Sequence, residues 1–253
     1  MSVFQFGSGV LTGTRTDLAG VQTPRRFGVL QDVSIDFAGD VKMLFGTNQY
    51  PVDTARGKTK IDGKAKFAAL QASGYNDLFF GQTLATGQSK YAYNERTTLA
   101  TTTAAISYTV ANSASTPLVD QGVFYGGTGT TAGVQLTASS TASGSAVYAF
   151  NGSTGVYSFA GADSAAAVLV NYKYQVSTGF NIAINQQFMG TTPRFGLTLF
   201  QRFEGTDMVL DLFSATSSKL TYPTRIDDYV VSEMDFSAFA NAADEVGIWN
   251  LAQ

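Results

Sequence analysis

Cysteine and histidine are both absent from the 253 residues, and charged side chains are scarce. Without these two residue types the chain cannot form disulfides, thiol nucleophiles or histidine general bases. Zinc sites built from Cys and His are excluded for the same reason. Charged residues make up 14% of the chain, against roughly 25% in an average soluble domain. So little charge is typical of a protein that buries much of its surface against other chains.

Signals for a membrane, a secretory route or a nucleic acid are also missing. No apolar run approaches the ~18 residues of a membrane span, and no basic segment precedes an apolar core near residue 1. The net charge is −3, whereas a free-standing nucleic-acid-binding protein is usually basic. We therefore expect synthesis in a cytoplasm, no membrane partner and no cofactor.

The clearest pattern in the chain lies between Phe27 and Gly81. Residues 58–67 alternate between a charged and an apolar set, and period two indicates a strand with one solvated face. The charged set is Lys58, Lys60, Asp62, Lys64 and Lys66; the other set is Thr59, Ile61, Gly63, Ala65 and Phe67.

Elements on either side of this strand complete a predicted hairpin and helix. Residues 28–45 predict the first strand, with a bulge at Gly39-Asp40. Residues 46–57 would form a long tip between the two strands. Ser73 would cap a short helix that ends at Gly81. The apolar plug over the sheet would be Leu78, Phe79 and Phe80.

The remainder of the chain predicts three further regions. Residues 1–26 are rich in glycine and predict an N-terminal arm. Residues 97–178 predict an inserted all-β lobe, because short apolar runs recur there about every ten residues with turn signals between them. Residues 179–253 alternate again and would complete a core with residues 27–96. The runs of the lobe are Ile106–Val110, Gly122–Tyr125, Val134–Thr137, Ala146–Phe150, Val156–Phe159 and Val168–Tyr174.

Motifs that would indicate catalysis or nucleotide binding are weak. Residues 127–132 fit G-x-G-x-x-A, but no helix pattern follows, so we interpret them as a glycine loop. Asp227 and Asp228, with Glu233 and Asp235, form the densest acidic cluster. Their spacing matches no calcium loop, and we interpret them as an acidic surface. No enzymatic activity is expected.

Basic and acidic side chains are segregated along the chain. Residues 42–66 are mainly basic, and residues 203–253 are mainly acidic. Such polarity suits head-to-tail contacts between subunits. The alternative is an ordinary match within one chain, with the two regions adjacent in one sheet. The candidate pairing residues are Lys58, Lys60, Lys64, Lys66, Asp227, Asp228, Glu233 and Asp235.

The order of these elements resembles that of the tail tube (major tail) proteins of long-tailed bacteriophages. The resemblance lies in Leu44–Gly46, Tyr50-Pro51, the Lys-rich strand 58–67 and the NDLFFG helix at 76–81. Residues 220–236 (LTYPTRIDDYVVSEMDF) are similar to the family's late strands, which end in an aspartate-rich edge.

The resemblance implies a mainly β fold, a β-sandwich or barrel with one short flanking helix, a long hairpin loop and the all-β insertion. It further implies hexameric rings that stack into a tube in the virion tail, other tail proteins at the tube ends, and transient, non-specific passage of DNA. The loop that reaches the neighbouring ring would include Thr47, Asn48, Gln49, Tyr50, Pro51, Val52, Asp53 and Arg56.

The resemblance also gives an expectation for the bore. A tube that must release DNA should not bind it tightly, so acidic side chains should outnumber basic ones there, with the lysines paired at subunit contacts. Two other functions remain open from the sequence. One is a carbohydrate-binding or adhesive β module, and the other is a hydrolase that uses Asp227 and Asp228.

Overall fold

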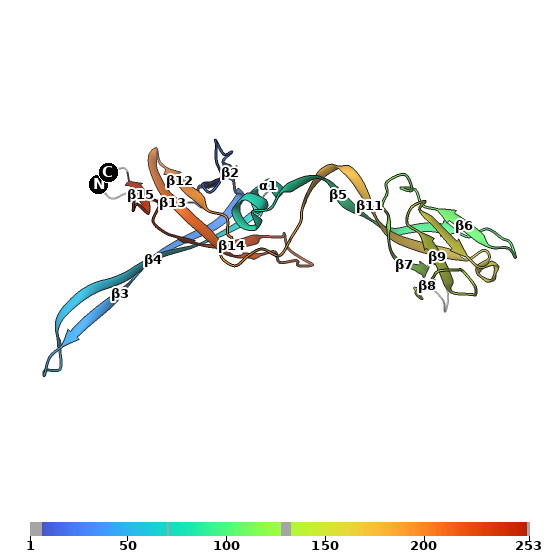
Figure 1. Cartoon of the computed structure of the whole chain (residues 1–253), viewed down its shortest axis with the longest axis horizontal. Helices are drawn as coiled ribbons and strands as arrows, with labels where there is room; N and C mark the ends of the chain where they lie inside the picture. The colour runs from blue at the N-terminus through green and yellow to red at the C-terminus, as the bar shows by residue number, and fades with distance from the viewer. Residues whose placement is uncertain (1–6, 70, 128–132, 252–253) are drawn as a thin grey trace. The chain divides into compact units, whose positions relative to one another are not determined.

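The computed structural model describes residues 7–69, 71–127 and 133–251 (Figure 1). The chain divides into two compact units, Met1–Leu84 with Ile182–Gln253, and Ala85–Asn181. We call them unit 1 and unit 2. Both consist mainly of β-strands, so the predicted β-rich fold class is confirmed. Unit 2 begins earlier than the predicted lobe 97–178, because strand β5 (Leu84–Thr98) lies beside strand β11 (Ala167–Ile182) in one sheet.

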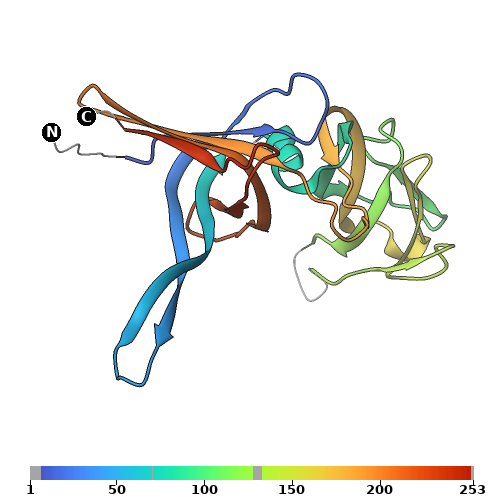
Figure 2. The ribbon, with the colours of Figure 1, turned by 60° about the vertical axis from the view of Figure 1, so that its left-hand side comes forward.

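Unit 1 contains a single large sheet whose two ends are adjacent in the sequence. The strand order is β2-β1-β12-β13-β14-β4-β3, and β15 pairs with β13. Only Phe27 separates β2 from β3, so the two ends of the strand order lie close together at this residue. Figure 2 shows the long β3–β4 hairpin projecting from the other strands of unit 1. The strands are β1 (Val10–Arg15), β2 (Arg25–Arg26), β3 (Gly28–Phe45), β4 (Pro51–Ala69), β12 (Phe195–Phe203), β13 (Thr206–Thr221), β14 (Ser232–Ala238) and β15 (Gly247–Leu251).

The inward-facing side chains of this sheet form the core of unit 1. They recur at every second residue, as expected where one face of a strand is buried. Strand β1, which falls within the segment predicted to be an arm, adds Leu11 to this core. The other large members are Phe27, Phe67, Leu78, Phe195, Leu197, Leu199, Met208, Leu210, Leu212, Met234 and Phe236.

The predicted hairpin is present, with a shorter tip. Strand β3 has the predicted bounds, and its register with β4 shifts between Gly39 and Val41, at the position of the predicted bulge, although the extra residue there belongs to β4. The tip was predicted to span residues 46–57, which is wrong, because β4 begins at Pro51 and leaves only residues 46–50 in the turn. Proline is compatible with the first position of a strand, because the backbone N–H that it lacks is not needed there for a hydrogen bond to the neighbouring strand.

A short helical segment follows the hairpin. It consists of α1 (Ala72–Tyr75) and a π-helical turn (Asn76–Phe80), and it ends at Gly81 in the left-handed conformation, as predicted. The predicted cap at Ser73 is wrong, because Gln71 occupies the N-cap position without a side-chain bond. Leu78 is fully buried, whereas Phe79 and Phe80 are only partly buried. The plug over the core is therefore mainly Leu78.

Unit 2 consists of two small sheets around its own core. One has the order β6-β10-β9-β8 and the other β5-β11-β7. Most predicted runs of the lobe coincide with strands, but 134–137 contributes only Thr137, and residues 128–132 of the glycine loop lie outside the described residues. The remaining strands are β6 (Ile106–Thr109), β7 (Val119–Tyr125), β8 (Thr137–Ser139), β9 (Val147–Asn151) and β10 (Val156–Phe159).

Carboxylates that accept hydrogen bonds from tyrosines tie the strands of unit 2 together. Asp120 accepts from the hydroxyls of Tyr148 at 2.5 Å and Tyr157 at 2.8 Å. Both tyrosines are almost fully buried, at 2% and 0% exposure. Similar bonds join Glu95 to Tyr108 and Tyr172, and Asp163 to Tyr125. Hydrogen bonds to a charged acceptor are stronger than neutral ones, so these bonds fix the packing of the unit.

These tyrosines predict a loss of stability in alkali. Burial, together with the bond to Asp120, raises the pKa of Tyr148 and of Tyr157 above the ordinary value. A folded-state pKa above the unfolded value gives stability that is complete below the unfolded pKa of about 10 and falls as the pH rises beyond it. We expect the free energy of unfolding of unit 2 to be level up to about that pH and then to decline. Hydrogen exchange of the unit 2 amides, followed together with the absorbance of tyrosinate, would measure this decline in stability. Unit 2 amides that remain protected well above that pH would contradict the expectation.

Candidate assembly surface

The lysines of β4 find acidic partners within the same chain. Strand β14 lies beside β4 with Glu233 opposite Lys66 and Asp235 opposite Lys64. The ammonium group of Lys64 lies 2.9 Å from Glu233 and 3.8 Å from Asp235. That of Lys66 lies 3.5 Å from Asp32.

Lys60 is also paired inside the chain, at 2.8 Å from Asp62. For Lys60, Lys64 and Lys66 the structure thus favours the intramolecular alternative over pairing between subunits. The physical reason is that carboxylates lie beside these lysines in the same sheet: Asp32 on the neighbouring strand β3, Asp62 on β4 itself, and Glu233 and Asp235 on the neighbouring strand β14. Basic and acidic side chains that are segregated along the sequence therefore neutralise one another locally in the folded chain.

Protonation of these groups follows the same pairing. The hydrogen bond to Glu233 raises the pKa of Lys64, and the hydrogen bond from Lys64 lowers the pKa of Glu233. The hydrogen bond with Lys60 likewise lowers the pKa of Asp62. These side chains are solvent-accessible, and exposed ion pairs contribute little to stability. Their effect is to remove net charge from this face of the sheet.

The remaining predicted charges behave differently. Asp227 and Asp228 lie in the loop between β13 and β14, and Asp228 is 3.8 Å from Arg225. Neither Lys58 nor Asp227 forms an ion pair with any residue that the structure describes. A role for these two side chains between subunits stays a prediction.

The outer half of the β3–β4 hairpin leaves the rest of unit 1 and lacks a covering layer. The last contact of β14 with β4 is the pair Ala238–Ile61, and near this point Phe37 stacks on Trp249 with ring centroids 5.7 Å apart. Beyond it, residues 38–60 are exposed on both faces. Strand β3 is the last in the sheet order, so its outer edge has no neighbour among the described strands.

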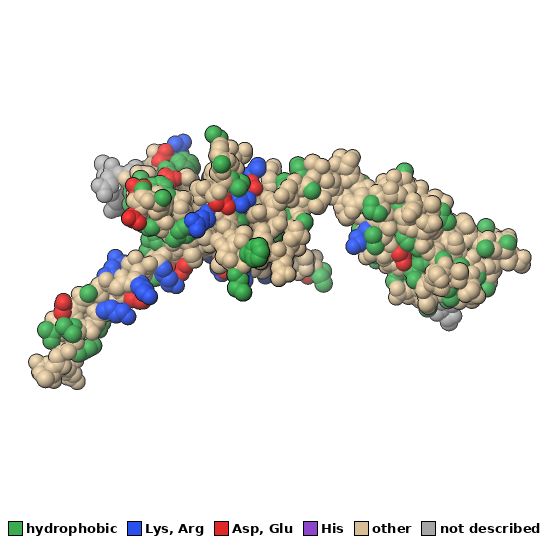
Figure 3. Space-filling view, in the orientation of Figure 1, with side chains coloured by type: hydrophobic (Ala, Val, Ile, Leu, Met, Phe, Trp, Pro, Cys, Tyr) green, Lys and Arg blue, Asp and Glu red, His purple; other side chains and the backbone are tan. Residues whose placement is uncertain are grey.

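On one face of this outer half the residues that β3 contributes are apolar, whereas β4 places Arg56 and Thr54 opposite Val41 and Met43. Val41, Met43 and Phe45 recur at every second residue of β3 and therefore share a face. They continue the row that begins with Val33 and Ile35, which pack on the core of unit 1. Here the same row has nothing to pack on, and the three side chains are 55–60% exposed. Figure 3 shows hydrophobic side chains near the tip and basic ones closer to the base.

The predicted loop residues lie on this outer half. Thr47, Asn48, Gln49 and Tyr50 form the turn, and Tyr50 is 79% exposed. Pro51, Val52, Asp53 and Arg56 belong to β4. Sequence reasoning missed Val41, Met43 and Phe45, because alternation predicts which side chains share a face but not whether anything covers that face.

The outer half of the hairpin should be marginally stable by itself. An isolated two-stranded ribbon is at best weakly stable in water, and local stability follows the number of buried contacts. We expect amides of residues 41–56 to exchange rapidly in the isolated chain, while those of β12 and β13 are protected. Hydrogen-exchange mass spectrometry of the full chain measures this directly. Protection of the tip equal to that of β13 in a monomer would contradict the expectation.

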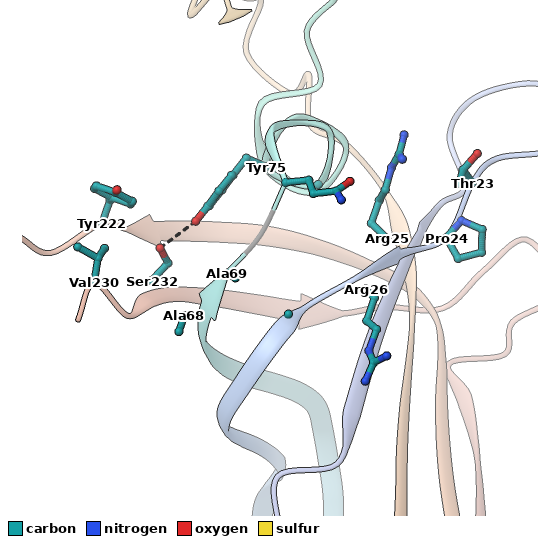
Figure 4. A pocket seen from close by; sticks show the side chains of 13 residues that line it. Thr23, Pro24, Arg25, Arg26, Ala68, Ala69, Tyr75, Tyr222, Val230 and Ser232 are labelled. Atoms are coloured by element: carbon teal, nitrogen blue, oxygen red, sulfur yellow. Dashed lines mark hydrogen bonds between the residues drawn. The ribbon is translucent and has the colours of Figure 1, made fainter. Parts of the chain in front are cut away.

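A cleft lies at the opposite end of the same hairpin (Figure 4). It has a volume of about 760 Å³, and its wall is formed by the segment around β2, the end of β4 with the start of α1, the two ends of the loop after β13, and the start of β14. Tyr75 and Ser232 share a hydrogen bond of 2.9 Å across it. Tyr222 and Val230 provide an apolar edge. Sequence reasoning did not find this cleft, because its lining residues are far apart along the chain.

The described residues contain no group of three or more acidic, His or Cys side chains placed to hold a metal ion. Among them there is also no helix whose length and apolar character would allow it to cross a membrane. Comparison with protein-family models and with curated proteins gave no match.

Proposed function

We propose that this chain is a structural subunit of a bacteriophage tail tube, which forms hexameric rings that stack around a channel for DNA. The proposal includes a tail-tube type of β-sandwich or barrel for unit 1, location in the virion tail, and no catalytic role. Other tail proteins would meet the tube at its ends. Unit 2 would be an added lobe outside the channel.

The observation that carries the proposal is the outer half of the hairpin. Long exposed apolar strands are an aggregation hazard, and monomeric proteins normally shorten, charge or cover them. Here an 18-residue edge strand keeps Val41, Met43 and Phe45 exposed. Such an element is explained if identical neighbours cover it, since obligate assembly buries large apolar surfaces.

The charge distribution also supports a channel that lets DNA pass. Lys60, Lys64 and Lys66 are neutralised by carboxylates of the same chain. Unpaired lysines that line the bore would bind the phosphates of DNA, because neutralising a phosphate releases its counterions and so favours binding. Lysines that are already paired with carboxylates have little tendency to bind phosphates. The proposal therefore does not depend on the lysines being covered by other subunits.

Negative-stain electron microscopy of the purified full-length chain tests the proposal. Rings of six subunits or tubes with a central channel are the expected particles, with sedimentation measured in parallel. A chain that stays strictly monomeric over the concentration range in which tubes should form would overturn it.

A second candidate function rests on unit 2. Tyr91 and Tyr93 on β5 are both exposed, and their ring centroids lie 6.3 Å apart. Neighbouring aromatic faces offer a large amphipathic contact area, which suits a carbohydrate-binding or adhesive module. A glycan array tests this function. Binding that Tyr93→Ala abolishes, together with a chain that does not assemble, would favour this function over the tube.

A further inference from the structure

The hairpin tip and the cleft lie at opposite ends of one long hairpin. The cleft is lined by Gly28 and Ala69, which pair at the base of the hairpin, and the tip lies beyond Phe45 and Pro51. Strand β3 spans 18 residues between these ends. At about 3.3 Å per residue the ends are about 60 Å apart, so a tip cannot reach the cleft of its own chain.

The two ends are complementary in polarity. The tip presents Tyr50 and Val52, which are among the most exposed apolar side chains of the hairpin. The cleft offers apolar surface from Ala68, Tyr222 and Val230. Its volume of about 760 Å³ falls within the range of cavities that enclose a ligand of several ring-sized groups, which is enough for the side chains at the end of one hairpin.

A single pair of opposite charges, one at each end, adds to this match. At the cleft, Arg25 is held by Asp77 at 2.7 Å, while Arg26 is exposed and has no ion pair with any described residue. At the tip, Asp53 accepts a hydrogen bond from the backbone N–H of Thr54 and likewise lacks an ion pair within the part of the chain that the structure describes. One unpaired cation therefore matches one unpaired anion.

We propose that the hairpin tip of one copy docks in this cleft of a second copy, with Tyr50 and Val52 against Tyr222 and Val230 and with Asp53 facing Arg26. The contact is heterologous, because a tip meets a cleft and not another tip. Heterologous contacts either close into a ring or repeat in one direction as an open filament, and the second outcome is the one that stacking along a tube requires. The inference rests on the proposed tube, for which it supplies the acceptor of the hairpin and a polarity along the tube.

Engineered disulfides test this contact directly, because the chain contains no other cysteine. Tyr50→Cys and Val230→Cys are introduced together in the full-length chain, assembled, and treated with a mild oxidant. A bond forms only where the two Cα atoms come within about 7 Å. A ladder of covalent multimers on a non-reducing gel is expected. The matched control is Tyr50→Cys with Tyr93→Cys, in which an exposed tyrosine of unit 2 replaces the cleft residue.

Charge reversal provides a second test that does not require bond formation. Arg26→Asp alone and Asp53→Arg alone should each lower the amount of tube, and the two changes together should restore it. Tubes that form normally but give no ladder beyond the control, and no restoration by the double reversal, would overturn this contact and leave the proposed function standing. Failure of the unmodified chain to assemble at all would overturn both.

Discussion

Replacing Val41, Met43 and Phe45 together by threonine is expected to abolish assembly and to leave both units folded. These side chains are more than half exposed in the single chain, so their loss removes little from its core. If neighbours cover the exposed part, just over half of each side chain, each contributes roughly 0.8–1.7 kcal/mol through burial. Their combined loss, roughly 2.5–5 kcal/mol, would weaken assembly by between about 60-fold and a few thousandfold, since 1.4 kcal/mol corresponds to a factor of ten. Threonine retains the strand preference of the hairpin.

Electron microscopy and sedimentation measure the assembly of this variant, and circular dichroism measures its fold. The matched control replaces Tyr91, Tyr93 and Val119 of unit 2 by threonine, because these are also at least half exposed. The control should assemble normally if unit 2 lies outside the tube. Tubes of normal length from the hairpin variant would show that the apolar face is not an assembly contact.

Local patterns in the sequence predicted local structure well. The bounds of β3 and the end of the helical segment at Gly81 were correct, and a bulge occurs at Gly39-Asp40 as predicted, although its extra residue lies in β4. Each depends on residues that are neighbours along the chain, such as a glycine whose φ of 64° few other residues adopt. The start of β4 was missed because Pro51 is compatible with both a turn and the first residue of a strand.

Features that depend on distant residues were not predictable. Whether Lys64 pairs within the chain or between chains depends on β14 lying next to β4, and their residues are far apart in the sequence. The cleft beside Tyr75 combines four separate segments. The exposure of Val41 depends on where β14 ends, since the same alternation continues through buried and exposed parts of β3. A sequence pattern defines a face, whereas the partner of that face is set by the fold.

The composition of the chain is consistent with this division of the surface. Few charges are available, and those on the inner part of the hairpin neutralise one another within the chain. Exposed apolar residues are found on the outer half of the hairpin, and others are spread over both units. Low net charge on a protein promotes association, so specific contacts must determine the geometry of that association.

The second large effect is expected at the centre of unit 2. Asp120→Ala removes the acceptor that the hydroxyls of Tyr148 and Tyr157 share. Tyr157 keeps only a long contact of 3.4 Å to the carbonyl of Asn171. Each buried hydroxyl left without a good partner costs about 1–3 kcal/mol. The total, roughly 2–6 kcal/mol, is comparable with the whole stability of a small domain.

We therefore expect the amides of unit 2 to lose most of their exchange protection in Asp120→Ala, while the single tryptophan, Trp249 in β15 of unit 1, keeps its fluorescence. Asp227→Ala, at an exposed loop carboxylate, is the matched control and should change stability by no more than about 0.5 kcal/mol. The decisive comparison is Asp120→Ala made together with Tyr148→Phe and Tyr157→Phe. If the cost arises from stranded hydroxyls, deleting them should recover most of the protection. Equal losses in both backgrounds would show that the two hydroxyls are not the cause, and that Asp120 acts through packing or through the hydrogen bond that it accepts from the backbone N–H of Gly122.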